Sequence, residues 1–190
     1  AVNDAPVGSD TLMVTDEDTE YSGVLVGVDV EDDPLIYGIV DSTLHGSVII
    51  TDADAGTFSY GPSMNYNGSD QFSYFVQDSS LTDTAIVSIT VNAVNDTPVS
   101  LDSSFAINED NSFTGALLAD DVDGDEMIYT IVDSSLNGTV IITDSTSGVY
   151  TYDPGMNYNG NDLFKFSVHD GLLSDTSQVS ITIHAVNDAP

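Results

Sequence analysis

Three aspartates alternate along one short stretch, Asp121, Asp123 and Asp125, and the pair Asn95-Asp96 precedes them in the chain. Each of these side chains offers an oxygen atom that can bind a hard cation. Calcium takes six to eight oxygen ligands in flexible geometry, so loops from separate strands can supply them together. Magnesium demands a tighter octahedron and keeps several waters, which makes it the poorer match. These residue types therefore predict a calcium site.

The charge of the whole chain points the same way. The sequence holds 32 acidic residues against a single base, Lys165, for a formal net charge of −31 at pH 7. A chain this acidic repels itself unless cations are bound. Nucleic acid is excluded as a partner because nothing in the chain could neutralise phosphates, and an anionic membrane surface would repel it as well. Surface solvation of the kind that halophilic proteins use is an alternative explanation of the charge.

The chain is a repeat of one long unit. The residues Ala-Val-Asn-Asp stand at 1–4, 93–96 and 185–188, and the copies align without a gap at an offset of 92, with 46 of 92 paired positions identical. A fixed long period is typical of a repeat array. We therefore predict two domains, residues 1–94 and 95–190, joined by a linker centred on 93–98. Because both ends fall on the repeat boundary, we interpret the chain as a piece of a longer one.

Apolar residues alternate with polar ones almost throughout, which is the pattern of half-buried β-strands. The clearest run is Phe72, Tyr74 and Val76, which is repeated by Phe164, Phe166 and Val168. Asn-Gly pairs mark tight turns between such runs, and no stretch has helical spacing with a cap. About seven short strands per unit are typical of a β-sandwich. The predicted fold class is all-β, with two tandem Greek-key β-sandwich domains.

Strand direction can be counted from one end of a unit to the other, and the count gathers the acids at the two ends. The top of unit 1 receives Asp29, Glu31, Asp33 and Asp78, and its foot receives Glu17, Asp18 and Asp70. The top of unit 2 receives Asp121, Asp123, Asp125 and Asp170. We therefore expect three sets of oxygen ligands to converge on Asn95-Asp96. The alternative for any single residue is that Asp, Asn and Gly simply form turns.

One longer pattern occurs in both copies: Tyr-x-Pro-x-x-Asn-Tyr-Asn-Gly-x-Asp-x-Phe, then Val-x-Asp, then Val-Asn-Asp-x-Pro. It spans Gly61-Pro62 to Asp78 in the first copy and Tyr152 to Asp170 in the second. This pattern resembles the cadherin-like tandem repeats of large bacterial surface adhesins of the RTX type, and the resemblance covers the whole chain. It implies cadherin-like/Ig-like β-sandwiches that are strung end to end with calcium in the joints.

The resemblance also implies which residues bind the ion. Asn95-Asp96 match the Asn-Asp of the cadherin linker, and Asp121, Asp123 and Asp125 match its Asp-x-Asp loop. Glu17 matches the acid at the foot of the first strand, and Asp170 matches a later apical Asp. Over both copies, the predicted metal ligands are Asn3, Asp4, Glu17, Asp18, Asp29, Glu31, Asp33, Asp70, Asp78, Asn95, Asp96, Glu109, Asp121, Asp123, Asp125, Asp162, Asp170, Asn187 and Asp188.

The sequence also departs from the cadherin pattern. The first Asp of the cadherin linker is Ala93 here, and its last Asn is Thr97. The Asp-Arg-Glu box has no literal counterpart, and only Asp70 stands near its place. These departures suggest fewer ions per joint than cadherins hold. The loop that begins at Asp121 also resembles part of an EF-hand, but it lacks that loop's final Glu and its flanking helices.

Catalytic chemistry has little support in the sequence. The three histidines do not recur in the other copy, and no serine is singled out as a nucleophile beside a histidine and an acid. There are no cysteines, which excludes disulfides and zinc–thiolate sites. Paired carboxylates for glycoside cleavage stay open as an alternative, but no cleft is evident. We expect no enzyme and no cofactor other than Ca2+.

The expected function is that of a calcium-rigidified extender module of a secreted bacterial cell-surface adhesin, which holds adhesive domains away from the cell. Its expected partners are the neighbouring repeats of the same chain, with surface polysaccharide as a further one, and the chain is expected to be monomeric and extracellular. The alternatives are a calcium-dependent carbohydrate-binding module and a homophilic adhesion module. Tyr66 and Tyr158 would favour sugar binding if they project outward.

Overall fold

The computed structural model describes residues 2–187. All the regular elements in this part of the chain are β-strands, and it contains no helix that could span a membrane. The chain divides into two compact units, Ala1–Val94 and Asn95–Pro190. The all-β fold class predicted from the alternation of apolar residues is confirmed.

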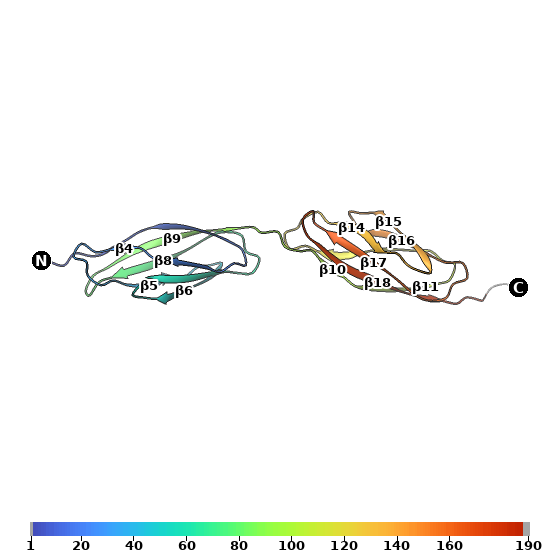
Figure 1. The fold of residues 1–190 in the computed structure, drawn as a ribbon, viewed down its shortest axis with the longest axis horizontal. Coiled ribbons are helices and arrows are strands. Elements are labelled where there is room, and N and C mark those ends of the chain that lie inside the picture. Colours follow the sequence, from blue (N-terminus) through green and yellow to red (C-terminus); the bar gives the residue numbers. More distant parts are fainter. Residues whose placement is uncertain (1, 188–190) are drawn as a thin grey trace. The chain divides into compact units, whose positions relative to one another are not determined.

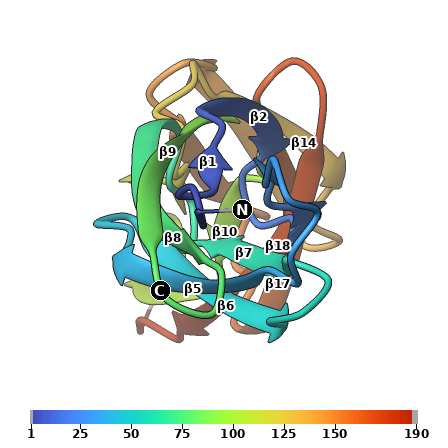
Figure 2. The same ribbon diagram turned by 90° about the vertical axis from the view of Figure 1, so that its left-hand side faces the viewer.

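Unit 1 is a sandwich of a four-stranded and a three-stranded sheet (Figure 1). The larger sheet has the order β2-β9-β8-β5, the smaller one β3-β7-β6, and β1 pairs only with β4. Figure 2 shows β9, β8 and β5 side by side. The strands are β1 (Val7–Gly8), β2 (Thr11–Asp16), β3 (Tyr21–Val24), β4 (Gly27–Val28), β5 (Ile36–Asp41), β6 (Gly46–Asp52), β7 (Thr57–Pro62), β8 (Gly68–Gln77) and β9 (Thr82–Asn92).

Unit 2 repeats this plan strand for strand. Its sheets have the orders β11-β18-β17-β14, β12-β16-β15 and β10-β13. The strands are β10 (Val99–Leu101), β11 (Ser103–Asn108), β12 (Phe113–Ala116), β13 (Leu118–Asp120), β14 (Ile128–Asp133), β15 (Gly138–Asp144), β16 (Val149–Pro154), β17 (Gly160–His169) and β18 (Ser174–His184). Seven of the nine strands in each unit form the two main sheets, as the sequence predicts.

The first strand of each unit is split between two partners. In unit 1, β1 pairs antiparallel with β4, whereas β2 pairs parallel with β9, so that Met13 lies opposite Ile89. In unit 2, β11 pairs parallel with β18 in the same register. The other strand pairs are antiparallel. The parallel pair joins the beginning of a unit to its end, and both strands run towards the foot.

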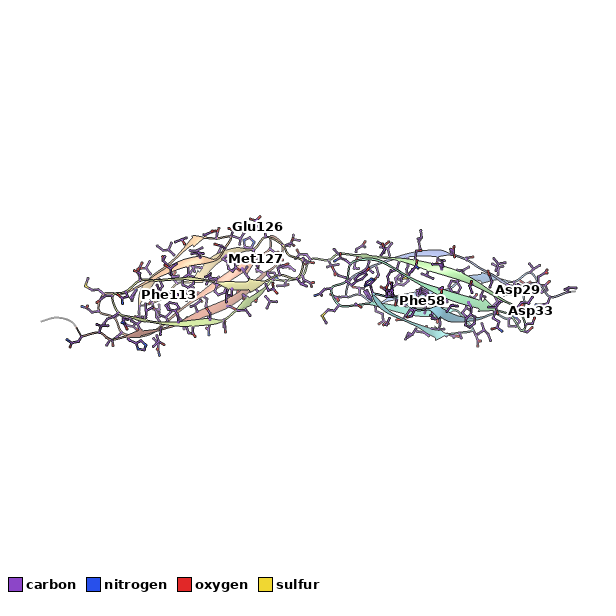
Figure 3. All side chains as sticks on the ribbon, turned by 180° about the vertical axis from the view of Figure 1, so that it is seen from behind. Asp29, Asp33, Phe58, Phe113, Glu126 and Met127 are labelled. Carbon is purple, nitrogen blue, oxygen red and sulfur yellow. The ribbon has the colours of Figure 1, made fainter. Side chains whose placement is uncertain are left out.

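Aromatic and β-branched side chains that alternate along β7, β8 and β9 fill the space between the sheets. Phe72, Tyr74 and Val76 are almost completely buried. Phe58 meets Phe72 edge to face with ring centroids 5.3 Å apart, and their copies Tyr150 and Phe164 meet at 5.2 Å. Figure 3 shows Phe58 among the strands of its unit. Burying one such side chain contributes about 1.5–3 kcal/mol to the stability of the fold. The core therefore stabilises the two sheets, and the loops at the ends of each sandwich are anchored to these sheets.

Two edge strands of each unit carry a β-bulge. Along β5, Ile39 pairs with Tyr74 of β8, and Asp41 pairs with the adjacent Ser73. Val40 is therefore left without a partner in the ladder. Along β6 the same shift lies between Ile50 and Asp52. Both bulges recur in unit 2, on β14 and β15. A bulge twists a strand and interrupts its hydrogen-bonding ladder.

Candidate metal centres

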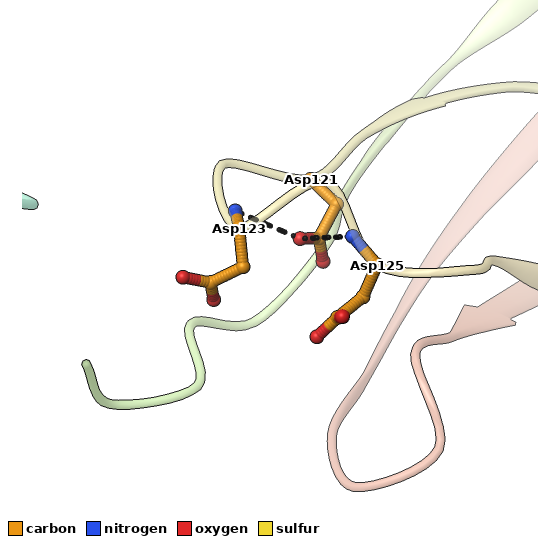
Figure 4. Close-up of side chains that lie close together, drawn as sticks. All are labelled: Asp121, Asp123 and Asp125. Carbon is orange, nitrogen blue, oxygen red and sulfur yellow. Dashed lines mark hydrogen bonds between the residues drawn. The ribbon is translucent and has the colours of Figure 1, made fainter.

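The loop that follows β13 is folded by one of its own aspartates. Asp121 Oδ1 accepts hydrogen bonds from the backbone N–H groups of Asp123 at 3.0 Å and Asp125 at 3.4 Å (Figure 4). It also accepts from the N–H of Gly124 at 3.1 Å. Gly124 has a φ of +77°, a conformation in which glycine carries no steric cost. This turn brings one carboxylate oxygen each from Asp121, Asp123 and Asp125 within 4.8 Å of one another. The three aspartates that the sequence grouped by spacing are therefore grouped in space.

The linker residues at the start of unit 2 are hydrogen-bonded to this end of the sandwich. The backbone N–H of Asp96 donates to Asp123 Oδ2 at 2.7 Å, and Asn95 Nδ2 donates to Asp170 Oδ2 at 2.8 Å. Together with the N–H groups of Leu173 and Leu172, the Asn95 amide holds the pKa of Asp170 below its usual range. Asp170 therefore stays ionised at neutral pH, and it adds a further negative charge to the apex of unit 2.

One oxygen of this cluster has no partner. Asp121 Oδ2 is buried and receives no hydrogen bond. Leaving a buried acceptor unsatisfied costs about 1–3 kcal/mol, and more when the group is charged. The only base in the chain, Lys165, is paired with Asp133 at 3.4 Å. With this base engaged elsewhere, a hard cation from outside the chain would satisfy the oxygen, and such a cation fits an all-oxygen set.

The apex of unit 1 is built in the same way. Asp29 Oδ1 accepts from the N–H groups of Glu31 at 2.9 Å and Asp33 at 3.2 Å, and Figure 3 shows Asp29 and Asp33 close together. Asp29 is only 6% exposed, and its Oδ2, like that of Asp121, is buried without a hydrogen-bond partner. Asn3 Nδ2 donates to Asp78 Oδ2 at 2.8 Å. The apical loop of each unit thus carries a buried carboxylate oxygen without a hydrogen-bond partner, on Asp29 in unit 1 and on Asp121 in unit 2.

Asp78 is held by hydrogen bonds from the loop that follows β8. Its Oδ1 accepts from the N–H of Ser80 at 2.6 Å and from that of Leu81 at 2.7 Å. These two bonds, with the Asn3 side chain in third place, lower the pKa of Asp78. The carboxylate is therefore ionised at neutral pH, as its copy Asp170 is.

At the foot of each unit, a buried glutamate holds the end of the last strand. Glu17 is 4% exposed, and its Oε1 accepts from the backbone N–H of Val94 at 2.6 Å. Glu109 receives Val186 N–H at the same distance. The bond between Val94 and Glu17 fixes the last residue of unit 1 before the linker. Glu17 therefore lies where the sequence placed it, and its role as a metal ligand stays a prediction.

Asp18 and Asp110 are turn residues beside these glutamates. Asp18 has a φ of +54° and accepts from the N–H of Asn65 at 3.1 Å, and Asp110 accepts from that of Asn157 at 2.9 Å. Aspartate tolerates this left-handed conformation better than most residues. The turn explains why an aspartate stands at these positions, so the turn reading that the sequence left open applies here.

Asp70 lies buried at the foot, and its two oxygens are occupied by four donors. It accepts from Tyr60 Oη at 3.0 Å and from the N–H groups of Leu44 (3.1 Å), His45 (3.1 Å) and Gln71 (2.9 Å). Burial and this hydrogen bond to Asp70 raise the pKa of Tyr60. Asp162 holds the equivalent groups in unit 2. The structure gives both residues a loop-fastening role that the sequence did not predict, and it leaves no orphaned oxygen for a cation.

The last predicted ligands lie at the end of the chain. Asn187 is exposed just after β18, and Asp188 lies outside the described residues. Sequence reasoning also missed two acids. Asp83 accepts from Gly8 N–H at 2.9 Å and thereby fixes β1, and Asp175 does the same for β10 through Ser100 N–H at 2.8 Å. The Ser100 hydroxyl and amide lower the pKa of Asp175. The available signal was that both acids recur at the repeat offset.

The two tyrosines of the lower turns do not project outward. Tyr66 packs against the core of unit 1, donates its hydroxyl to Ser69 O at 2.7 Å and stacks on His45 with ring centroids 4.2 Å apart. Tyr158 packs against the core of unit 2 and donates to Asn161 O at 2.9 Å. Neither ring is presented as a platform on which a sugar could stack.

A β-sandwich whose first strand pairs in parallel with its last, repeated in tandem with an acidic apex on each copy, defines a cadherin-like or Ig-like class of domain. The comparisons with known proteins agree. Residues 95–185 match the family model of the bacterial cadherin-like domain, and residues 3–90 match that of the bacterial Ig domain. Unit 2 therefore belongs to the bacterial cadherin-like domain family and unit 1 to the bacterial Ig domain family, and the predicted resemblance is confirmed at that level.

Solved structures share the fold at low sequence identity. Domains EC1-2 of human protocadherin-24 align with 97% of this chain and 100% of their own, at 18% identity and a TM-score of 0.60. The EC1-3 domains of mouse clustered protocadherin PcdhgC3 align with 98% of this chain and 69% of theirs, at 15% identity and a TM-score of 0.50. Identities this low show a common fold and nothing more.

An endo-fucoidan hydrolase of glycoside hydrolase family 107 also aligns with 96% of the chain, at 20% identity and a TM-score of 0.44. The chain spans only 29% of the length of that enzyme. No curated protein sequence matches the chain.

Proposed function

We propose that this chain is a calcium-rigidified extender module of a bacterial cell-surface adhesin. One observation carries the proposal. Each unit buries a carboxylate oxygen, Asp29 Oδ2 or Asp121 Oδ2, that has no hydrogen-bond partner and belongs to a loop with further acids. With one base against 32 acids in the sequence, an external cation would satisfy both oxygens.

The residues that would hold the ion in unit 2 are Asp121, Asp123 and Asp125, with Asn95 and Asp96 from the linker. All five offer oxygen, which matches the preference of calcium, and the converging loop tolerates its irregular geometry. A bound calcium ion would supply positive charge to the cluster. The chain's own part is to fold the loop through Asp121 Oδ1 and to bring the linker backbone to Asp123.

Stiffness of the linker follows from this assignment. The linker is fastened on the unit 1 side by the bond from Val94 N–H to Glu17, and on the unit 2 side by the bonds of Asn95 and Asp96 to Asp170 and Asp123. Asn95 and Asp96 are half-buried against unit 2. Cation binding at this apex would neutralise the repulsion among the carboxylates that hold the linker. The linker would then stay fastened to unit 2.

Such a module works as a spacer outside the cell. Bacterial cadherin-like and Ig domains are typical of surface proteins, and calcium sites of modest affinity suit extracellular calcium near the millimolar range. Its proposed partners are the neighbouring repeats of the same chain, with surface polysaccharide as a further partner, and the proposed state is a monomer. Because Tyr66 and Tyr158 pack against the cores of their units, binding of polysaccharide would depend on other residues.

Thermal stability tests the calcium sites. A ligand that binds only the folded state stabilises it by about 2.7 kcal/mol at a hundredfold excess over its Kd. We expect chelation to lower the melting temperature of the chain, and calcium to restore it better than equal magnesium. Full restoration by sodium chloride alone would mean that charge screening explains the effect, and the proposal would then fail.

Matched variants locate the sites. Asp123→Ala removes a converging carboxylate, so we expect it to weaken calcium binding in calorimetric titration. Asp144→Ala removes an acid from the hairpin turn between β15 and β16, where the Asp144 carboxylate accepts from Thr146 and Ser147 N–H. This control should leave binding nearly unchanged. Equal losses from the two variants would mean that calcium is held diffusely by the surface charge.

A further inference from the structure

We infer that the two apices bind calcium with different affinities, and that the middle residue of each apical loop, Glu31 in unit 1 and Asp123 in unit 2, sets the difference. The apex of unit 2 is the tighter site. This inference rests on the proposed function, because it grades sites whose ligand is calcium. It concerns the chain's own residues, and a single charge-conserving exchange in each unit tests it.

The two apices differ at few positions, which makes them an internal comparison. The residues at 3, 4, 29, 33 and 78 are identical to those at 95, 96, 121, 125 and 170. The loop backbone is fixed alike, since Asp29 Oδ1 and Asp121 Oδ1 each accept from the residues two and four positions further on. The position between Glu31 and Asp33 has a positive φ in both copies, as Asp32 at +58° and Gly124 at +77°. Among the three acids of each loop, only the middle side chain differs in length, as Glu31 in unit 1 and Asp123 in unit 2.

Both apices have the feature that calls for a cation, so the difference is one of degree. Asp29 is 94% buried, because its exposed fraction is 6%, and its Oδ2 has no hydrogen-bond partner. Asp121 Oδ2 is likewise buried and without one. An unpartnered carboxylate oxygen of this kind is costly, and cation binding removes the cost in either unit. The first ligand is therefore equivalent in the two sites.

The second ligand is not equivalent. In unit 2, Asp123 Oδ2 receives Asp96 N–H at 2.7 Å, and oxygens of Asp121, Asp123 and Asp125 lie within 4.8 Å of one another. In unit 1, Glu31 Oε2 receives Asp4 N–H at 3.4 Å, a long contact. Among the described residues, the only three acids that converge in this way are those of unit 2. Asp29, Glu31 and Asp33 form no such group, and Glu31 is the one of the three whose side chain differs from its counterpart in unit 2.

Two energy terms then favour unit 2. Ordering a flexible side chain on binding costs conformational entropy, and Glu31 loses more of it than Asp123 because its side chain has one more rotatable bond. Converging carboxylates also repel one another before the ion arrives, and binding relieves that repulsion. The opposing term is burial, since Glu31 is half-buried and Asp123 exposed. The burial of Glu31 does not group three carboxylate oxygens in unit 1. We therefore expect the grouping of the three aspartates in unit 2 to have the larger effect on calcium affinity.

The experiment is calcium titration of the whole chain by calorimetry, with one apex silenced at a time. Asp121→Asn silences unit 2 and Asp29→Asn silences unit 1. Both keep the Oδ1 acceptor that folds the loop. In the Asp121→Asn background, Glu31→Asp should tighten binding about tenfold, which corresponds to 1.4 kcal/mol. In the Asp29→Asn background, Asp123→Glu should weaken it by a similar factor. Asp144→Glu, which lies in a hairpin turn, is the control and should change nothing.

The outcomes separate the two proposals. Calcium binding at both apices with no response to either exchange would overturn the grading and leave the proposed function standing. No specific binding at either apex would overturn the proposed function itself. Because each exchange replaces one acid by another, the net charge of its background stays the same, and a change in affinity cannot be assigned to altered screening. Circular dichroism of each variant without calcium shows whether the β-structure is intact. If Asp29→Asn does not fold, the Glu31→Asp exchange in the Asp121→Asn background still tests the grading.

Discussion

Aspartate performs at least three tasks in this chain, and its neighbours decide which one. Asp70 uses both oxygens to fasten a loop, and Asp144 folds a hairpin turn. Bonds from the Thr146 side chain and nearby groups hold the pKa of Asp144 at about 2. Asp121 folds its loop with one oxygen and leaves the other unpartnered. Only the third arrangement leaves a charged atom that a cation would satisfy.

The loop-fastening role of Asp70 predicts a stability effect that is independent of calcium. Asp70→Ala would leave the buried Tyr60 hydroxyl and the N–H groups of Leu44 and His45 without their acceptor. We expect a loss of about 3 kcal/mol in the free energy of unfolding. Urea denaturation in chelator, followed by circular dichroism, measures it.

The matched control for this prediction is Asp52→Ala. Asp52 Oδ1 accepts from Asp54 and Ala55 N–H in an exposed turn, so its removal should cost less than about 1 kcal/mol. If the two variants lost the same stability, the four bonds to Asp70 would have no special role. A change in calcium affinity on Asp70→Ala, with the fold intact, would instead return Asp70 to the ligand set.

The strands were predictable because one face of each is buried. Phe72, Tyr74 and Val76 alternate in the sequence and are all buried in the structure. Their partners were harder to predict, since alternation says which face of a strand is covered and not which strand lies beside it. The parallel pairing of β2 with β9 is such a case. It depends on contacts between the two ends of a unit.

The acidic site was predictable to the same extent. Counting strand directions gathered Asp121, Asp123 and Asp125 at one end, and the structure places them there. Counting could not tell that the oxygens of Asp70 are occupied, because three of its donors are main-chain N–H groups. Every residue except proline has this group, so the sequence carries no mark of it.

The tyrosines between the sheets predict sensitivity to alkali. Burial raises the pKa of Tyr150 to about 12 and also raises those of Tyr74 and Tyr129. A tyrosine in the unfolded chain ionises near pH 10. Below that pH both states are neutral and stability is complete. Above it only the unfolded state ionises, so stability falls until the folded pKa is reached. The urea midpoint should therefore drop between about pH 10 and 12.

Tyr150→Phe provides the control, because unit 1 has Phe58 at the equivalent position. Burial is the only cause of the shift at Tyr150, so the variant should keep its stability at neutral pH and lose less of it in alkali. The difference should be about 1.4 kcal/mol per pH unit between the unfolded and folded pKa values. An identical alkaline loss in the variant would assign the effect to other groups.

At the scale of the whole molecule, the linker decides what the chain can do mechanically. It has few apolar residues, with Val94 about half exposed and Pro98 buried. So small an apolar set cannot fix the orientation of two domains by burial alone. Hydrogen bonds hold its residues on each unit, and the proposed calcium would strengthen the hold on unit 2. Under the proposed function, the stiffness of the chain therefore depends on how freely the linker moves.

Distance measurements test the extender proposal directly. Thr90 and Thr182 are equivalent exposed residues on the central strands β9 and β18. With both changed to cysteine and spin-labelled, we expect a narrow distance distribution in calcium and a broad one after chelation. Asp96→Ala should broaden it even in calcium. An unchanged distribution after calcium removal would leave calcium as a fold stabiliser at most.

The bulges on β5 and β6 matter for how a chain of near-copies folds at all. Each of these strands has one sheet neighbour, β8 or β7, so its other edge is unpaired. Half of the paired positions in the two copies are identical. While the chain is partly folded, a strand from one copy can therefore pair with the sheet of the other copy in place of its counterpart. Misassembly between similar domains is a common failure of repeat proteins. A bulge at Val40 or at the residue after Ile50 breaks the regular ladder that an intruding strand would need. Because the same two irregularities recur in each copy, both copies present edges that are poor templates for pairing with a strand of a neighbouring repeat.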